Sequence, residues 1–160
     1  MGKHAVHQRL LELLEIDLDV LQRAAQTAYE TATDEENVAE NKYDTLGLEA
    51  SYLATGQARR MEEIRQALKR CRELVLRPYD EQAGIQLGAL LALEAGNGSE
   101  QWLFLAPDAA GLKVEAAGRL ISVISPRSPL GGALLGKQDG DELTIQVSGV
   151  TQRYSIIRVE

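Results

Sequence analysis

LELLEIDLDVLQRAAQTAYETA, residues 11–32, is the stretch that sets the architecture of the first half of the chain. Its apolar and small residues recur at alternating intervals of three and four, at Leu11, Leu14, Leu18, Leu21, Ala25, Ala28 and Ala32. That spacing places them on one face of an α-helix, in the pattern of a coiled-coil seam.

A second seam of the same kind follows the polar segment TDEENVAEN, residues 33–41. Its members are Tyr43, Gly47, Ala50, Ala54, Gln57, Met61, Ile64, Leu68, Cys71 and Val75. Two helices of similar length that are joined by a short polar turn fold back on each other. Residues 1–77 are therefore predicted to form an antiparallel coiled-coil hairpin with an acidic tip.

The composition changes at Arg77 and Pro78, because all prolines and most glycines of the chain lie from there onward. Short apolar runs bounded by turn residues predict five strands, over residues 85–93, 101–106, 119–125, 142–147 and 152–159. A short helix is predicted over residues 128–137, with Ser128 as its N-cap, Pro129 at its first position and Gly136 at its end. Residues 78–160 thus form a predicted second domain, and the fold class is α+β.

The charge and cysteine content limit the partners and the compartment. The formal net charge of −7 disfavours broad binding to phosphate backbones and favours a partner with a basic surface or bound metal ions. A single cysteine excludes an internal disulfide and fits a reducing cytoplasm. No apolar run reaches the length of a signal peptide core or a membrane span, so a cytoplasmic location is predicted.

The segment ISVISPRSPLGGALLGKQDGDELTIQV, residues 121–147, resembles the C-terminal domain of the GreA/GreB transcript-cleavage factors. The family carries a Ser-Pro-apolar-Gly run that ends in Gly-Lys, which here is residues 128–137. An acidic turn follows at Asp139-Gly140-Asp141, and the last hairpin ends near Ile157 to Glu160.

The resemblance implies an FKBP-like antiparallel β-sheet domain with one short helix, which binds bacterial RNA polymerase while the coiled coil enters the secondary channel. The docking residues that it implies are Pro126, Ser128, Pro129, Leu130, Gly131 and Lys137. It further implies a monomer that meets nucleic acid only through the polymerase complex and that does not bind membranes.

The resemblance also implies that tip carboxylates assist cleavage of backtracked RNA. The candidates are Glu40, Asp34 and Glu36, of which Glu40 and Asp34 would hold a Mg²⁺ ion shared with the polymerase. Carboxylates are the ligands that this hard cation prefers, and phosphoryl transfer by two metal ions needs such ligands. The protein would be a helper of the polymerase active site, not an enzyme, and would bind no cofactor alone.

The tip departs from the family pattern, in which an acid lies three residues before a Glu-Asn pair. With Glu40-Asn41 as that pair, the acid position is the neutral Asn37; with Glu36-Asn37, it is Thr33. Two functions therefore stay open: a factor that stimulates cleavage, and a regulator or inhibitor that occupies the channel without cleavage.

Other motifs favour structural interpretations. GGALLGKQ imitates a phosphate-binding loop, but Gln138 replaces its hydroxyl and its glycines fall within and after a predicted helix. His4 and His7 are too few to form a metal site, and Cys71 is expected to be a buried, inert thiol.

A third function, from another class, is a peptidyl-prolyl isomerase built on the FKBP-like fold. That activity needs a pocket lined with aromatic side chains. The domain offers only Trp102, Phe104, Tyr79 and Tyr154, which strand alternation is expected to scatter.

Overall fold

The computed structural model describes residues 2–33 and 45–160, with side chains described for residues 2–27, 30 and 56–160. Leu13–Leu68 form one compact unit, and Met1–Glu12 together with Lys69–Glu160 form the other. The base of the helical region thus belongs to the same unit as the sheet. The domain boundary between residues 77 and 78 stays a prediction.

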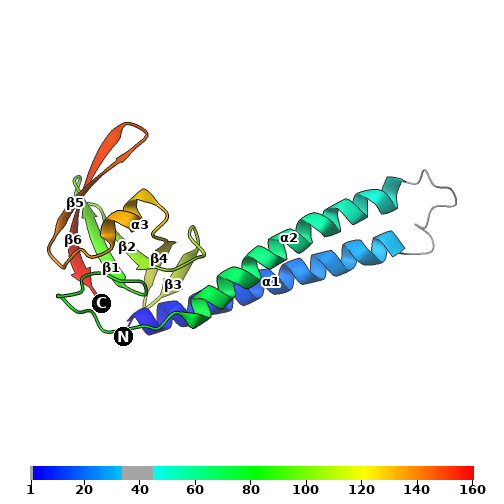
Figure 1. The fold of residues 1–160 in the computed structure, drawn as a ribbon, viewed down its shortest axis with the longest axis horizontal. Helices are drawn as coiled ribbons and strands as arrows, with labels where there is room; N and C mark the ends of the chain where they lie inside the picture. The colour runs from blue at the N-terminus through cyan, green and yellow to red at the C-terminus, as the bar shows by residue number, and fades with distance from the viewer. Residues whose placement is uncertain (1, 34–44) are drawn as a thin grey trace. The chain divides into compact units, whose positions relative to one another are not determined.

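Two long helices make up the first half of the chain and confirm the predicted hairpin. Helix α1 spans Gly2–Thr33 and α2 spans Thr45–Glu73, and they run side by side (Figure 1). At their base, Nε2 of His7 in α1 lies 2.6 Å from the carbonyl oxygen of Cys71 in α2. The start of α1 therefore meets the end of α2, as in an antiparallel pair.

The predicted seam is observed where side chains are described. Leu14, Ile64 and Leu68 are buried in the hairpin unit. Partial burial extends the seam outward through Leu18, Leu21, Ala25, Gln57 and Met61. The side chains of the seam members Ala28, Ala32, Tyr43, Gly47, Ala50 and Ala54 lie outside the described part of the chain.

The prediction that Val75 belongs to the seam of the second helix is wrong. Helix α2 ends at Glu73, and the Val75 side chain is 64% exposed. The heptad pattern continues for one position beyond the helix because periodicity alone carries no stop signal.

No helix among the described residues is long and apolar enough to span a membrane.

The second half of the chain forms a six-stranded sheet with one short helix (Figure 1). The elements are β1 Leu90–Ala95, β2 Glu100–Leu105, β3 Lys113–Ala116, β4 Arg119–Ile124, α3 Pro129–Leu134, β5 Glu142–Val147 and β6 Val150–Val159. The strand order is β3-β4-β2-β1-β6-β5. Neighbouring strands are antiparallel except for β2 and β4, which are parallel. The predicted α+β fold is therefore confirmed, with one parallel pair in a mostly antiparallel sheet.

Two parts of the strand prediction are wrong. Residues 85–89 are not a strand: Ile85 N donates to Lys137 O at 2.8 Å, and Gly88, at φ +92°, donates to Leu105 O at 2.7 Å. Strand β3 was not predicted, because four residues with a single buried side chain, Val114, give no clear alternation. It pairs with β4 across a turn at Ala117 and Gly118, both with positive φ.

The sheet buries apolar side chains on both faces. On one face, a cluster from β1, β2, β5 and β6 packs with Leu134 of α3 and with Ile85. On the other face, Phe104 is fully buried and stacks with His7 of α1, the ring centroids being 6.4 Å apart. Both faces of the central strands are therefore covered, which accounts for the continuous apolar run of residues 89–93.

Candidate protein-docking site

The loop that leads from β4 into α3, residues 125–128, which we call the capped loop, is fixed by its own backbone and by one hydroxyl. Ser128 Oγ accepts from Gly131 N at 3.0 Å and donates to Ser125 O at 2.9 Å. Ser128 N also donates to Ser125 O, at 3.1 Å. Ser128 is the N-cap of α3 and Pro129 follows it at the start of the helix, as predicted. These bonds set the path of residues 125–131, which contain most of the predicted docking residues.

Gly131 is required by a close approach within this loop. A Cβ atom at this position would lie 1.9 Å from the carbonyl oxygen of Ser125, well inside the contact distance of real side chains. Gly131 is buried, and its φ is not positive, so the need for glycine comes from packing. The short helix can therefore sit directly on the loop that precedes it.

The end of α3 is tied to a distant segment. Helix α3 ends at Leu134 with Leu135 as its C-cap, earlier than predicted, so Gly136, at φ +80°, lies just beyond the helix, and its N donates to Ile85 O at 2.9 Å. Gly84 approaches the backbone of Gly136 so closely that an added Cβ would lie 2.4 Å from Gly136 O. Residues 84–85 and 136–137 are thus held together by backbone contacts, including the bonds between Ile85 and residues 136 and 137.

The predicted docking residues differ in exposure. Pro129 is exposed; Pro126, Ser128, Leu130 and Lys137 are partly exposed; and Gly131 is buried. Leu130, one of the docking residues that the resemblance implies, is partly exposed and also packs against the core cluster. A large apolar side chain next to α3 is also exposed: Leu135, which directly follows the helix, is 42% exposed.

Leu135 forms one wall of an open groove, which we call the linker groove, with a volume of about 670 Å³. The groove is lined by Arg70, Glu73, Leu74, Val75, Arg77, Ile85, Gln86, Leu87, Pro107, Leu135 and Gly136. Val75 and Leu87 are exposed at 64% and 38%, so three large apolar side chains face solvent along it. A groove of this kind suits an apolar segment of a protein partner. No pattern in the sequence predicts this groove, since its walls come from four separate segments.

The rim of the linker groove carries both signs of charge. Arg70 Nη1 is bound to Asp108 Oδ2 at 2.8 Å, and Glu73 is exposed. Arg77 is exposed, and its carbonyl oxygen accepts from the buried Lys3 amine, which fixes the linker after α2. Burial lowers the pKa of Lys3, and the nearby Glu160 partly opposes that effect.

The predicted tip residues Asp34, Glu36 and Glu40 lie outside the described residues, and so does Asn37. The tip carboxylates and their shared Mg²⁺ therefore stay predictions. Among the described side chains, those of residues 2–27, 30 and 56–160, no group of three or more His, Cys, Asp or Glu residues could hold a metal ion. His4 is exposed, whereas His7 is used in the hairpin base.

The competing motifs have structural roles. Gly131 and Gly132 lie inside α3, as the structural interpretation of the imitated phosphate-binding loop requires. Among the four aromatic side chains considered for an isomerase pocket, Phe104 is fully buried and Arg119 covers Trp102 at 4.0 Å from the ring centroid. Tyr79 and Tyr154 hydrogen-bond to Asp139 N and Gln152, respectively. Each of these four side chains therefore makes contacts of its own, with different partners.

Cys71 is buried, as predicted, and it is an unpaired thiol. Burial raises the pKa of the Cys71 thiol to about 11, and the Asp108 carboxylate adds to this effect. A hydrogen bond to the Asp108 carbonyl partly opposes it. Because thiolate is the reactive form, this residue is a poor nucleophile near neutral pH.

We expect Cys71 to react slowly with a thiol reagent in the folded protein at pH 8 and to react rapidly once urea unfolds the chain. The pKa of the Cys71 thiol is higher in the folded protein, about 11, than its ordinary value of 9.0. The neutral buried thiol therefore makes its full contribution to the free energy of unfolding below pH 9.0, and this contribution is lost as the pH rises to about 11. Urea unfolding between pH 8 and 11 should show this loss relative to Cys71→Ala. Equal reactivity in the folded and unfolded protein would contradict the buried placement.

The structure defines a class of protein: an α+β chain with a helical hairpin and a mostly antiparallel sheet domain that presents a capped loop and an open apolar groove. Residues 111–160 match the family model described as "Transcription elongation factor, GreA/GreB, C-term". The C-terminal part of the chain is therefore similar to the C-terminal domain of the GreA/GreB transcription elongation factors.

Solved structures of similar proteins cover more of the chain. Thermus aquaticus Gfh1 shares 26% identity, with 98% of this chain and 94% of that chain covered and a TM-score of 0.41. Thermus thermophilus GreA factor homolog 1 shares 22%, with 98% and 95% covered and a TM-score of 0.39. A GreA/GreB factor from Nitrosomonas europaea shares 24%, with 62% and 78% covered and a TM-score of 0.36. No curated protein sequence gives a significant match.

Proposed function

We propose that the chain binds bacterial RNA polymerase in the cytoplasm and modulates transcript elongation, with its hairpin inserted into the secondary channel. The observation that supports this most is the family match over residues 111–160, which include the capped loop and α3. In this proposal the chain binds the polymerase as a monomer, and it contacts nucleic acid only within the polymerase complex.

The docking surface in this proposal combines exposed parts of the capped loop with the linker groove. Pro129 and Leu135 lie at the two ends of α3, and both are exposed. The groove offers apolar area, while Arg77 on its rim suits an acidic side chain of the partner. A polymerase segment with apolar residues and a neighbouring carboxylate fits this chemistry.

The tip acids give the proposal its mechanism. Glu40, with help from Asp34 or Glu36, would share a Mg²⁺ ion with the carboxylates of the polymerase. One exposed carboxylate holds Mg²⁺ weakly, because the ion keeps most of its waters. The protein would then complete a site that the polymerase largely supplies, and it would cleave no RNA by itself.

A second function is favoured by one residue. Asn37 occupies the position of the first acid if Glu40-Asn41 is the Glu-Asn pair of the family. A neutral amide is a weaker Mg²⁺ ligand than a carboxylate. A tip with one ligand fewer could occupy the channel and regulate or inhibit the polymerase without stimulating cleavage.

Transcript cleavage by a stalled polymerase tests the two functions. We expect cleavage that is at most weak with the wild type, a further loss with Glu40→Ala, and a gain of at least about tenfold with Asn37→Asp. The physical reason for the gain is the added charged ligand, since tenfold in rate corresponds to about 1.4 kcal/mol of transition-state stabilisation.

Binding of each tip variant to the polymerase serves as the control, because the docking surface lies elsewhere in the chain. Cleavage that survives simultaneous alanine substitution of Asp34, Glu35, Glu36 and Glu40 would exclude the carboxylate mechanism. No binding by the wild type would exclude the proposed function altogether.

A further inference from the structure

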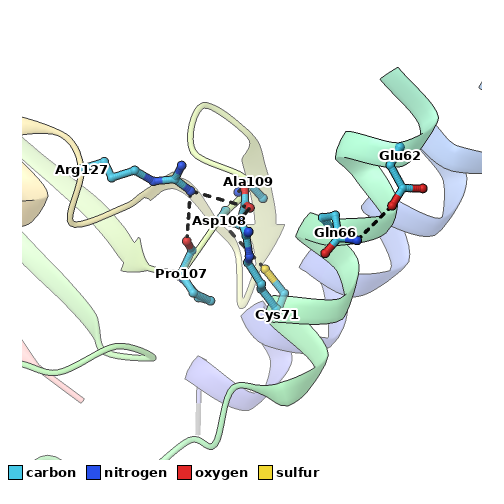
Figure 2. A network of polar contacts seen from close by, with 8 residues as sticks. Glu62, Gln66, Cys71, Pro107, Asp108, Ala109 and Arg127 are labelled. Atoms are coloured by element: carbon cyan, nitrogen blue, oxygen red, sulfur yellow. Dashed lines mark hydrogen bonds and ion pairs between the residues drawn. The ribbon is translucent and has the colours of Figure 1, made fainter. Parts of the chain in front are cut away.

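Asp108, in the loop between β2 and β3, makes contacts with two arginines from distant parts of the chain. Its Oδ2 accepts from Arg70 Nη1 of α2 at 2.8 Å and lies 3.7 Å from Arg127 Nη2 in the capped loop. Figure 2 shows Arg127 directed at both Asp108 and Pro107. One carboxylate therefore joins a groove residue to the loop that begins α3.

The position of this carboxylate is itself well defined. Asp108 Oδ1 accepts from the backbone N of Ala109 at 2.7 Å, and Ala109 has a φ of +69°. The flanking backbone is bound to β4, with Ala106 N donating to Ile124 O and Gly111 N donating to Val123 O. The Asp108 side chain is only 24% exposed, although Arg70 and Arg127 are exposed at 53% and 70%. The carboxylate is thus held in place by the surrounding backbone, and the two more exposed arginines bind to it.

Arg127 follows Pro126 and precedes Ser128, so it lies inside the capped loop. Its Nη2 also donates to Pro107 O at 3.4 Å, and Pro107 lines the linker groove. Among the described residues, the other side-chain hydrogen bonds of this loop join residues that are close in the sequence: Ser125, Ser128 and Gly131. Arg127 is therefore the side chain that anchors the outer part of the loop to the body of the domain.

We propose that Asp108 is a positioning residue for the docking surface, which holds the capped loop through Arg127 and the groove wall through Arg70. The inference rests on the proposed binding to polymerase. Asp108 need not touch the partner: its role is to keep the loop and the groove in one arrangement before binding, which lowers the ordering cost of the complex. The ion pairs are partly exposed, so the effect of each is modest.

Asp108→Asn tests this role, because it keeps the size of the side chain and an oxygen for Ala109 N but removes the charge. We expect the variant to bind polymerase about twofold to fivefold more weakly than the wild type. Asp80→Asn is the matched control, since Asp80 accepts from a local backbone amide, Gln82 N, in the same way. It should bind as the wild type does.

Two further backgrounds separate positioning from simple stabilisation. With Arg127→Gln already present, Asp108→Asn should cause a smaller further loss of affinity than it causes in the wild type, because only the contact with Arg70 remains to be lost. With Arg70→Gln present, Asp108→Asn should still weaken binding. An equal loss of affinity in the Arg127→Gln background would overturn the proposed route through the loop.

Hydrogen exchange in the free protein gives a readout that does not depend on the polymerase. The amides of Gly131 and Gly132, which donate to Ser128, should exchange faster in Asp108→Asn than in Asp80→Asn. Unchanged exchange, or unchanged affinity in a protein whose wild type binds polymerase, would overturn the inference. Failure of the wild type to bind would instead overturn the proposed function.

Discussion

Gly131→Ala should destabilise the C-terminal domain by about 3 kcal/mol, although alanine is the better helix former by about 1 kcal/mol. The added Cβ would lie 1.9 Å from Ser125 O, and that oxygen belongs to backbone that also receives two hydrogen bonds from Ser128. Rotation of a side chain cannot relieve this overlap, so α3 must move away from the capped loop. Overpacking therefore outweighs helix propensity.

Urea unfolding followed by tryptophan fluorescence measures this effect in the right domain, because the single tryptophan, Trp102, lies in β2. Gly96→Ala is the control: no atom lies within 4 Å of a Cβ placed there, and its φ is not positive. We expect a change within about 0.5 kcal/mol for this variant. If both variants unfold at the same urea concentration as the wild type, the close approach at Gly131 is contradicted.

Leu135→Asp should weaken polymerase binding by about 10- to 100-fold if the linker groove receives the partner. A carboxylate in the wall of an apolar groove would have to lose its water when the partner binds, and a central apolar anchor would be lost at the same time. The free protein should fold normally, because Leu135 is 42% exposed and follows the last residue of α3.

Leu120→Asp is the matched control for the groove. Leu120 is 58% exposed on β4 and does not line the groove, so the same change of side chain should leave affinity unchanged. Thermal unfolding of both variants checks that neither has lost its fold. Equal affinities of Leu135→Asp and the wild type, with binding intact, would remove the linker groove from the docking surface and leave the capped loop.

Much of the fold could be predicted from the sequence, because its signals are local and periodic. The three-and-four spacing from Leu11 onward predicted α1 and α2, and Ser128-Pro129 predicted the start of α3. Strand β5 was predicted with its observed bounds, Glu142–Val147, since its apolar residues alternate between polar ones. The predictions failed where the local signal was weak, at the short strand β3 and at residues 85–89.

The candidate site was only partly predictable. The motif of residues 126–137 predicted the short helix and the start of that helix, yet it did not show that Gly131 serves packing or that Leu130 packs against the core cluster. The linker groove and the contacts of Asp108 were missed entirely. No pattern along the chain relates Val75, Leu87, Pro107 and Leu135, which approach one another only in the folded domain.

The sequence alone thus determined the two long helices and most of the strands, where the capped helix begins, and which family motif the chain carries. Each of these depends on residues within a few positions of one another, through the periodicity of backbone structure and the hydrogen bonding of caps and turns. The tertiary structure alone decided which apolar residues stay in solvent, why Gly131 has no room for a side chain, and which arginines share Asp108. Those properties depend on distances between residues far apart in the chain, which are set only when the sheet, α3 and the ends of the helices pack together.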